Sequence, residues 1–163
     1  MKSYRVTRDR AGRWHIAFAL VPAPVPTPGN GQVIGIDRGV AVSAALSTGQ
    51  LLHVPGLTAR ERTRLLHLQR KLARARRGSN RRGHVKLARA RLKVRETDRR
   101  KDWAEKVSTD LARRFDVIRV EDLQIANMSR SAKGSMERPG RNVRAKARLN
   151  QGILRSGWGS MLM

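Results

Sequence analysis

The chain has no cysteine, which excludes disulfide bonds, a thiol nucleophile and a cysteine-based zinc site. Its four histidines are dispersed and do not show the spacing of zinc ligands. No apolar run approaches the roughly 18 residues that a membrane-spanning helix needs, and the first residues lack the apolar stretch of a signal peptide. We therefore expect a cytoplasmic protein with no zinc and no membrane partner.

Acidic and aromatic residues are also scarce. The 163 residues include 36 basic and 12 acidic side chains, a net charge of +24, but only three Trp, two Phe and one Tyr. The few aromatics argue against a sheet that stacks successive bases. The positive charge attracts polyanions, because each Lys or Arg that contacts a phosphate releases a condensed counterion. Nucleic acid is therefore the predicted partner, and a nucleoid-associated location follows from it.

The first part of the chain predicts a strand and then a linker. Apolar residues alternate with others over Trp14–Leu20, which is typical of a strand. Residues 22–31 contain four prolines and two glycines, a composition typical of an extended linker. Because a lone strand cannot bury its apolar face, we assign residues 1–21 to the end of an upstream domain and residues 32–163 to a separate one.

Residues 32–163 predict an α/β domain. Short strands are expected at 33–36, 40–46 and 50–54, helices at 58–77 and 81–115, and a further strand at 116–123. A last helix is expected near 142–157, with Leu149, Ile153 and Leu154 facing inward. A strand after long helices implies a return to the same sheet, so the sheet should be mixed. The helices are basic, since residues 58–101 hold 18 basic side chains and three acidic ones.

Two carboxylates follow apolar strands. Asp37 comes directly after Val-Ile-Gly-Ile, and Glu121 comes after Val-Ile-Arg-Val. A carboxylate in this position is costly unless it is paired or bound to a metal. If adjacent strands bring both together, they would suit a hard divalent cation such as Mg²⁺, as in two-metal nucleases. The alternative interpretation is that each acid forms an ion pair with one of the many basic residues.

The order of several motifs resembles a known family. Residues 35–40 read Gly-Ile-Asp-Arg-Gly-Val, and they are followed by Ser-Thr-Gly at 47–49, the basic helices, Val-Glu-Asp-Leu at 120–123 and Gly-Trp-Gly at 157–159. In this order they resemble TnpB, the OrfB-type transposase of insertion sequences, from about residue 13 to residue 163. Members of that family are RNA-guided DNA endonucleases related to type V CRISPR effectors, with an RNase H-like fold and a RuvC-type nuclease core.

The resemblance implies specific roles. Asp37 matches the first catalytic aspartate and Glu121 the catalytic glutamate, and both would bind Mg²⁺ during cleavage of DNA phosphodiester bonds. Residues 1–21 would end a β-barrel domain, and 32–163 would form a partial RuvC-like domain with a basic helical insertion at 58–115. The helices would line the heteroduplex of guide RNA and DNA, whose backbone such proteins read. The residues predicted to contact phosphates are Arg74, Arg76, Arg77, Arg81, Arg82 and Lys86.

The chain also departs from this family. The family has a cysteine-based zinc ribbon and a third catalytic aspartate, and this sequence contains neither. Asp122 does not easily replace that aspartate, because neighbours along a strand point to opposite faces. We therefore expect an RNase H-like core that is incomplete and truncated at both ends, and a poor or inactive nuclease.

Two other functions are compatible with the composition. The main alternative is a catalytically inactive remnant that binds DNA or RNA through charge alone. A ribosomal-type RNA-binding protein would explain the charge but not the two acids at strand ends.

Overall fold

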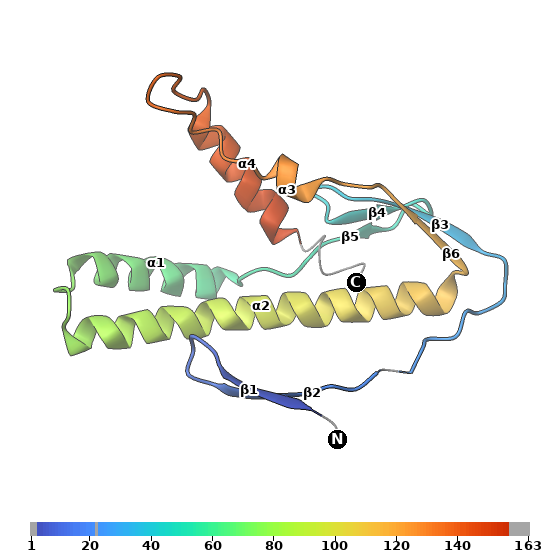
Figure 1. Cartoon of the computed structure of the whole chain (residues 1–163), viewed down its shortest axis with the longest axis horizontal. Helices are drawn as coiled ribbons and strands as arrows, with labels where there is room; N and C mark the ends of the chain where they lie inside the picture. The colour runs from blue at the N-terminus through green and yellow to red at the C-terminus, as the bar shows by residue number, and fades with distance from the viewer. Residues whose placement is uncertain (1–2, 22, 157–163) are drawn as a thin grey trace. The chain divides into compact units, whose positions relative to one another are not determined.

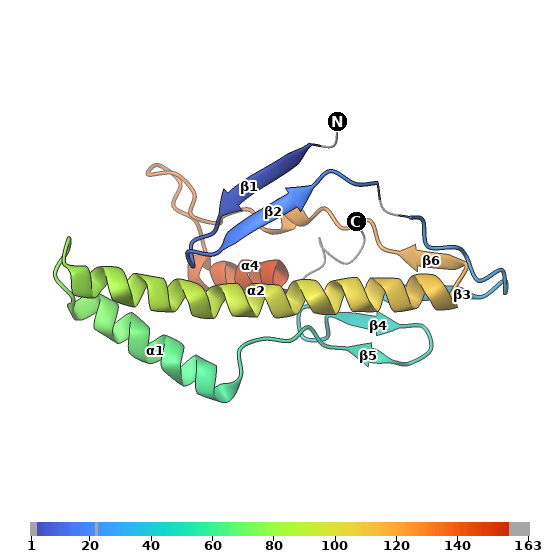
Figure 2. The same ribbon diagram turned by 90° about the horizontal axis from the view of Figure 1, so that it is seen from below.

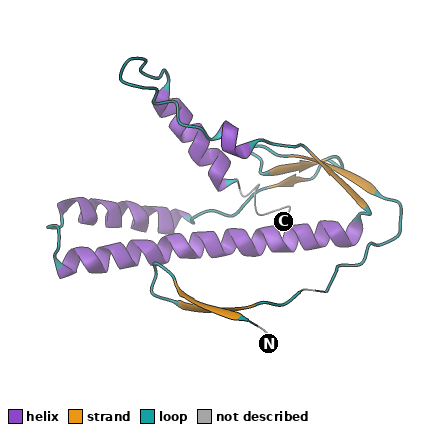
Figure 3. Ribbon diagram, in the orientation of Figure 1, coloured by secondary structure: helices purple, strands orange, loops and turns teal. Residues whose placement is uncertain are grey.

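The computed structural model describes residues 3–21 and 23–156, so the Gly-Trp-Gly motif at 157–159 lies outside the described residues. Helices and strands both contribute, as Figure 3 shows, which confirms the predicted α/β class. The elements are β1 (Tyr4–Arg8), β2 (Trp14–Phe18), β3 (Val33–Asp37), β4 (Ala44–Leu46), β5 (Leu51–Leu52), α1 (Ala59–Arg74), α2 (Asn80–Arg114), β6 (Val117–Val120), α3 (Ile125–Met128) and α4 (Val143–Arg155). None of the described helices is both long and apolar enough to cross a membrane.

The chain divides into two compact units, which are described separately. The first combines the described residues of Met1–Pro24 with Pro55–Arg100. The second combines Val25–Val54 with the described residues from Lys101 onward. The long helix α2 contributes its first half to one unit and its second half to the other.

The second unit contains a four-stranded mixed sheet in the order β5-β4-β3-β6 (Figure 1). Strands β3, β4 and β5 form an antiparallel meander, and β6 returns to pair with β3 in parallel. The predicted return of the strand after the helices is therefore confirmed. The register pairs Ile34 with Ile118 and Ile36 with Val120.

One face of this sheet packs on the second half of α2. Ile34, Ile36, Ala44 and Leu46 are buried there against Leu111 and Phe115 of the helical segment. Trp103 and Val107 pack against the same cluster. With Leu111 they recur at every fourth position, which places them on one face of the helix. The core of the second unit therefore lies on the face of β3 that carries residues 34 and 36. We call the opposite face, on which Val33 and Asp37 are exposed, the open face.

The strand expected at 40–46 is shorter than predicted, since β4 begins at Ala44. The backbone turns tightly before it, where a Cβ on Gly39 would lie 2.9 Å from the carbonyl oxygen of Val42. Because residues 39 and 42 approach each other so closely, the backbone between them bends and cannot form the extended start of the predicted strand. The strand expected at 50–54 is likewise limited to Leu51–Leu52.

Helix α4 is held by one stripe of residues spaced for a helix face. Lys146 donates to the Met128 carbonyl at 2.6 Å, Asn150 donates to the Ser129 carbonyl at 2.8 Å, and Ile153 is 3% exposed. Ile153 thus faces inward as predicted. The same expectation is wrong for the two leucines. Leu149 is 47% exposed and Leu154 is 68% exposed.

The glycine-rich end of the expected linker is anchored to the second unit. The Asp116 carboxylate accepts hydrogen bonds from the backbone N–H groups of Gly29, at 2.7 Å, and Gly31. Both glycines have φ of +68°, a conformation that L side chains rarely adopt. The Asn30 side chain adds a hydrogen bond to the Arg114 carbonyl at 3.0 Å. These contacts fix the start of β3 beside the start of β6.

The first unit contains a pair of antiparallel helices, α1 and the first half of α2, which lie side by side in Figures 1 and 2. The helices predicted at 58–77 and 81–115 are confirmed; α1 is shorter than expected at both ends, and α2 begins and ends one residue earlier than expected. Arg99 of α2 donates to the Gly56 carbonyl at 3.0 Å and to the Glu61 carboxylate. At the other end of the pair, Arg82 donates to the carbonyl groups of Leu72 and Ala75.

The first unit also contains a β-hairpin, so the strand predicted at 14–20 has a partner that the pattern did not reveal. Strands β1 and β2 pair antiparallel, with Tyr4 opposite Phe18 and Val6 opposite Ile16. This face is apolar and exposed, since Phe18 is 72% and Ile16 is 61% exposed. Arg13 ties the hairpin to α2 through an ion pair with Asp98 at 2.8 Å.

Glu61 makes the start of α1 sensitive to pH. Its carboxylate accepts from Arg99 and from the Thr58 backbone N–H at 3.0 Å, and these two contacts lower the pKa of Glu61 from about 4.5 to about 2. The stabilisation from the ionised carboxylate is therefore present above pH 4.5 and is lost as the pH falls toward 2.

We expect Glu61→Gln to lower the melting temperature at pH 7, because it removes the ion pair with Arg99 and weakens the cap. The difference from the wild-type chain should shrink between pH 4.5 and pH 2. Thermal melts followed by circular dichroism at several pH values measure both. Asp102→Asn, at an exposed helical ion pair, is the matched control and should change little. A difference that stays constant with pH would contradict the role of the Glu61 carboxylate.

Candidate functional site

The parallel pairing of β3 and β6 brings the two predicted site carboxylates together. Ile36 of β3 is paired with Val120 of β6. Asp37 directly follows Ile36, and Glu121 directly follows Val120. Paired residues of parallel neighbours point to the same face, and adjacent strands lie about 4.8 Å apart. Both residues are exposed. Asp37 and Glu121 are therefore neighbours on the open face of the sheet, opposite the core that contains Ile34 and Ile36.

These two carboxylates line one concavity of about 470 Å³. Its floor is made of small residues, because Gly35, Ala45 and Ser47 occupy the same face as Asp37. Two hydrogen bonds connect Gly35 to Ser47, which directly follows β4. The Gly35 N–H donates to the Ser47 hydroxyl at 3.1 Å, and the Ser47 N–H donates to the Gly35 carbonyl at 2.9 Å. The complete lining is Gly35, Ile36, Asp37, Ala45, Leu46, Ser47, Arg119, Val120 and Glu121.

Two arginines belong to this site although the sequence pattern singled out neither. Arg38 donates from Nη2 to the backbone carbonyl of Glu121, which ties together the ends of the two strands that carry the acids. Arg119 lies two residues before Glu121 and pairs in register with Gly35. Because residues two apart on a strand share a face, an alternation count from Glu121 would have identified Arg119.

The donor set suits a hard divalent cation bound in part by water. Two carboxylates on neighbouring strands supply oxygen ligands, which Mg²⁺ prefers, and Mg²⁺ sites in proteins use one or two carboxylates and keep several waters. Among the residues that the structure describes, no three His, Asp or Glu side chains gather as a metal-binding group. The carboxylates of Asp37 and Glu121 line one concavity and could supply two ligands to a cation there, with room for water and a further ligand.

The predicted phosphate contacts are distributed over the helical pair of the first unit. Arg74, Arg76 and Arg81 line one concavity of about 490 Å³ together with Lys71, at the turn between α1 and α2. We call this the hairpin-tip groove; the remaining lining residues are Ala75 and Ser79. Four cations without an acid in the lining create a strongly positive local potential.

The other three predicted residues have different surroundings. The guanidinium of Arg82 donates from Nη1 to the carbonyls of Leu72, at 2.7 Å, and Ala75, at 3.0 Å, so it caps the end of α1. Lys86 lines a separate concavity of about 290 Å³ with Arg10, Arg89 and Lys93. Arg77 is exposed at the turn.

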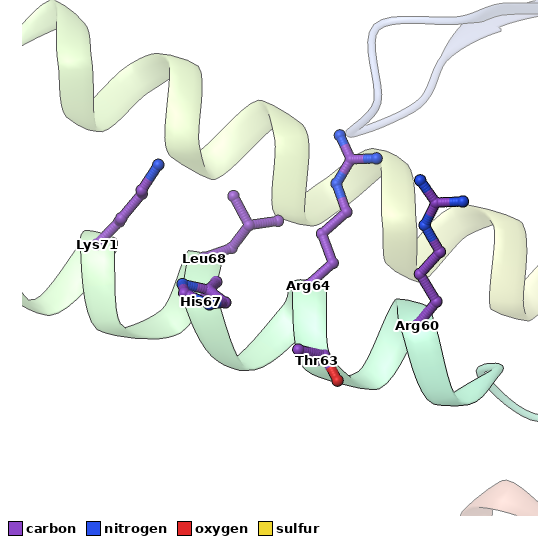
Figure 4. Close-up of a pocket in the computed structure, with 6 residues that line it drawn as sticks. All are labelled: Arg60, Thr63, Arg64, His67, Leu68 and Lys71. Carbon is purple, nitrogen blue, oxygen red and sulfur yellow. The ribbon is translucent and has the colours of Figure 1, made fainter.

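A third basic surface runs along α1 and was not singled out residue by residue in the sequence. The concavity has a volume of about 600 Å³ and is lined by Arg60, Thr63, Arg64, His67, Leu68 and Lys71. Figure 4 shows the side chains of Arg60, Arg64 and Lys71 extending in the same direction from the helix. The spacing of residues 60, 64 and 71 would place them on one helix face, which is the signal that could have revealed them.

Comparisons with known proteins agree with the order of the motifs. Residues 6–132 match the family OrfB_IS605, which is described as "Probable transposase". The chain is 37% identical over 152 residues to "Putative RNA-guided DNA endonuclease InsQ" of Escherichia coli (strain K12), an alignment that covers 92% of this chain and 38% of that protein. It is also 37% identical over 128 residues to "Putative RNA-guided DNA endonuclease" of Streptomyces pristinaespiralis, which covers 78% of this chain and 32% of the relative.

The chain therefore spans about a third of the length of these relatives, 38% of the first and 32% of the second. The family match covers more than half of the chain and includes both Asp37 and Glu121. The recognition of the family from the ordered motifs is thus confirmed, and the chain belongs to the OrfB_IS605 family of TnpB-type transposases.

Proposed function

We propose that this chain forms part of an RNA-guided DNA endonuclease and supplies two of its metal ligands. In this proposal residues 32–163 are a partial RNase H-like domain of the RuvC type, and residues 58–115 are its basic helical insertion. Residues 1–21 end an upstream β-barrel domain, and residues 22–31 link the two. The names of the two relatives support an RNA guide and a DNA target.

The observation that carries the proposal is the position of Asp37 beside Glu121. The two residues follow paired positions of β3 and β6 and line the same concavity. Two carboxylates so close repel each other unless a cation lies between them. In a chain with 36 basic residues, neither carboxylate side chain forms an ion pair within the described residues. This arrangement favours metal binding over the ion-pair interpretation.

The residues of the site have separate tasks in this proposal. Asp37 and Glu121 hold Mg²⁺, which when bound activates water and stabilises the charge that develops on the phosphodiester. Arg38 keeps the ends of β3 and β6 together through the Glu121 carbonyl. Gly35, Ala45 and Ser47 leave space above the sheet for the substrate, because their side chains are small.

The helical pair binds the backbone of the guide RNA and its DNA target in this proposal. The hairpin-tip groove gathers Arg74, Arg76 and Arg81 with Lys71, and Arg77 and Lys86 lie near it in sequence. Arginine suits this task because its planar guanidinium makes bidentate contacts with phosphate. Arg82 takes part chiefly by holding the end of α1 in place.

A second candidate function is charge-driven binding of DNA or RNA without catalysis. The observation that favours it is the size of the acidic cluster, since the described residues contain no group of three metal ligands. Two carboxylates bind a divalent cation less tightly than three and fix its position less well. We therefore expect poor or no cleavage by the chain alone, whichever candidate is correct.

Metal binding by the purified chain tests the proposal directly. Titration with Mn²⁺, followed by the electron paramagnetic resonance signal of the free ion, should show a site that Asp37→Asn and Glu121→Gln each weaken by about tenfold or more, because each removes an anionic ligand. Asp102→Asn, at a solvent-exposed acid on α2, is the matched control. Equal Mn²⁺ affinity in all four proteins would sink the proposal and leave charge-driven binding as the better function.

A further inference from the structure

One guanidinium on the open face of the sheet is not used by any contact described so far. Arg119 is exposed on β6 and lines the same concavity as the two acids. It lies beside Gly35 in register, so the neighbouring position on β3 offers no side chain to cover it. Glu121 follows β6 two residues after Arg119, so at about 3.3 Å per extended residue their Cα atoms lie about 6.6 Å apart.

Arg119 also differs from the other arginine of this site. Arg38 is half-buried, and its Nη2 donates a hydrogen bond to the Glu121 carbonyl. The side chain of Arg119 makes no ion pair or hydrogen bond with another described residue, although two carboxylates share its concavity. Its donors therefore remain available to a ligand that enters the concavity.

The charges of the concavity favour an anionic ligand once a cation is bound. Asp37 and Glu121 together carry two negative charges, which a divalent cation neutralises. The guanidinium of Arg119 then remains as the uncompensated charge of the lining. A phosphodiester carries one negative charge and two non-bridging oxygens, which match the paired N–H donors of a guanidinium.

We propose that Arg119 binds a non-bridging oxygen of the nucleic-acid phosphodiester next to the cation held by Asp37 and Glu121. This inference rests on the proposed function. Arg119 thereby positions the phosphate over the floor formed by Gly35, Ala45 and Ser47. Because the guanidinium and the cation have the same sign and share one concavity, Arg119 also weakens cation binding when no phosphate is present.

Arg119 is expected to strengthen phosphate binding and to weaken cation binding, so the two effects can be measured separately. The probe is a fluorescent 20-nucleotide single-stranded DNA, with affinity measured by anisotropy in about 0.3 M KCl to suppress non-specific contacts. Measurements in EDTA and in Ca²⁺ give the gain in affinity that depends on the cation. In Arg119→Gln we expect this gain to fall by about tenfold, the worth of one charge-assisted hydrogen bond. Its Mn²⁺ affinity should equal or exceed that of the wild-type chain.

Arg119→Lys keeps the charge and should recover part of the gain, because a lysine lacks the bidentate fork. Arg113→Gln is the matched control, since Arg113 is exposed in the same unit and does not line the concavity. It should weaken DNA binding equally in EDTA and in Ca²⁺. The inference is wrong if Arg119→Gln behaves like this control, or if it loses Mn²⁺ binding, which would mean that Arg119 holds the acids in place.

The same measurements separate failure of the inference from failure of the proposed function. If the wild-type chain shows no cation-dependent gain and binds Mn²⁺ no better than Asp37→Asn, both are overturned. If the wild-type chain shows the gain and Asp37→Asn abolishes it, but Arg119→Gln retains it, the metal site stands and the assignment of Arg119 falls.

Discussion

Replacing Lys71, Arg74, Arg76 and Arg81 with glutamine should weaken binding to a 20-base-pair RNA–DNA heteroduplex by about a hundredfold at 0.15 M salt. These four cations line the hairpin-tip groove, with no acid among the lining residues. Each phosphate contact contributes a slope of about 0.9 to the dependence of log affinity on log salt, so losing four contacts should lower the slope by about 3.6. Arg82 is left unchanged, because its Nη1 caps α1 and its loss would disturb the helical pair.

The control is a variant with the same change in charge at four scattered positions. Arg62, Arg70, Arg91 and Arg95 are exposed on the same two helices and line none of the concavities described above. Their replacement with glutamine should reduce affinity much less, because long-range attraction is screened beyond about 8–10 Å. Titrations at several salt concentrations give both slopes. Equal losses in the two variants would show that total charge, and not the groove, governs binding.

Ile34→Ala should destabilise the second unit by about 2–5 kcal/mol, the usual cost of removing a large buried aliphatic side chain. Ile34 has no exposed surface and is the largest of the fully buried side chains in the described chain. It lies in β3, one of the two central strands, and packs in a cluster with Leu111 of α2 and Phe115, which directly follows the helix. Loss of this packing loosens β3, which carries Asp37, so the Mn²⁺ affinity should fall along with stability. Urea unfolding followed by circular dichroism measures the change.

Val33→Ala is the matched control on the same strand. Val33 precedes Ile34 and is 49% exposed on the opposite face. Its replacement should cost less than about 1 kcal/mol and leave Mn²⁺ binding unchanged. A loss of Mn²⁺ affinity in Val33→Ala, or an Ile34→Ala chain as stable as the wild type, would contradict the assignment of the core to the other face of β3.

Several features of the fold could be predicted because local sequence is enough to form them. Trp103, Val107 and Leu111 recur at every fourth position, a spacing typical of one helix face, and all three belong to the core of the second unit. The stretch at 116–123 predicted a strand that returns to the sheet, and β6, which covers Val117–Val120, pairs with β3. The ordered motifs around Asp37 and Glu121 were specific enough to identify the family, which the match over residues 6–132 confirms.

Predictions were less successful where contacts between distant residues decide the structure. The extended stretch at 40–43 is interrupted because Gly39 lies against the Val42 carbonyl. Leu149 and Leu154 are exposed because α4 is attached through Lys146, Asn150 and Ile153 instead. Arg82 looked equivalent to Arg81 in a run of basic residues, yet it bonds to carbonyls on the preceding helix. In each case the local pattern is compatible with two arrangements, and the packing partner selects one.

In the candidate site, too, some features follow from the local sequence and others depend on contacts between distant residues. Its two acids could be predicted from sequence, because a carboxylate at the end of an apolar strand is recognisable by itself. Their placement side by side depends on the parallel register of β3 and β6, which are separated by both long helices. That register also brings Arg119 beside Gly35 and lets Arg38 reach the Glu121 carbonyl. Residues so far apart in the chain meet only when backbone hydrogen bonds between the strands set their alignment, and no local sequence pattern encodes that alignment.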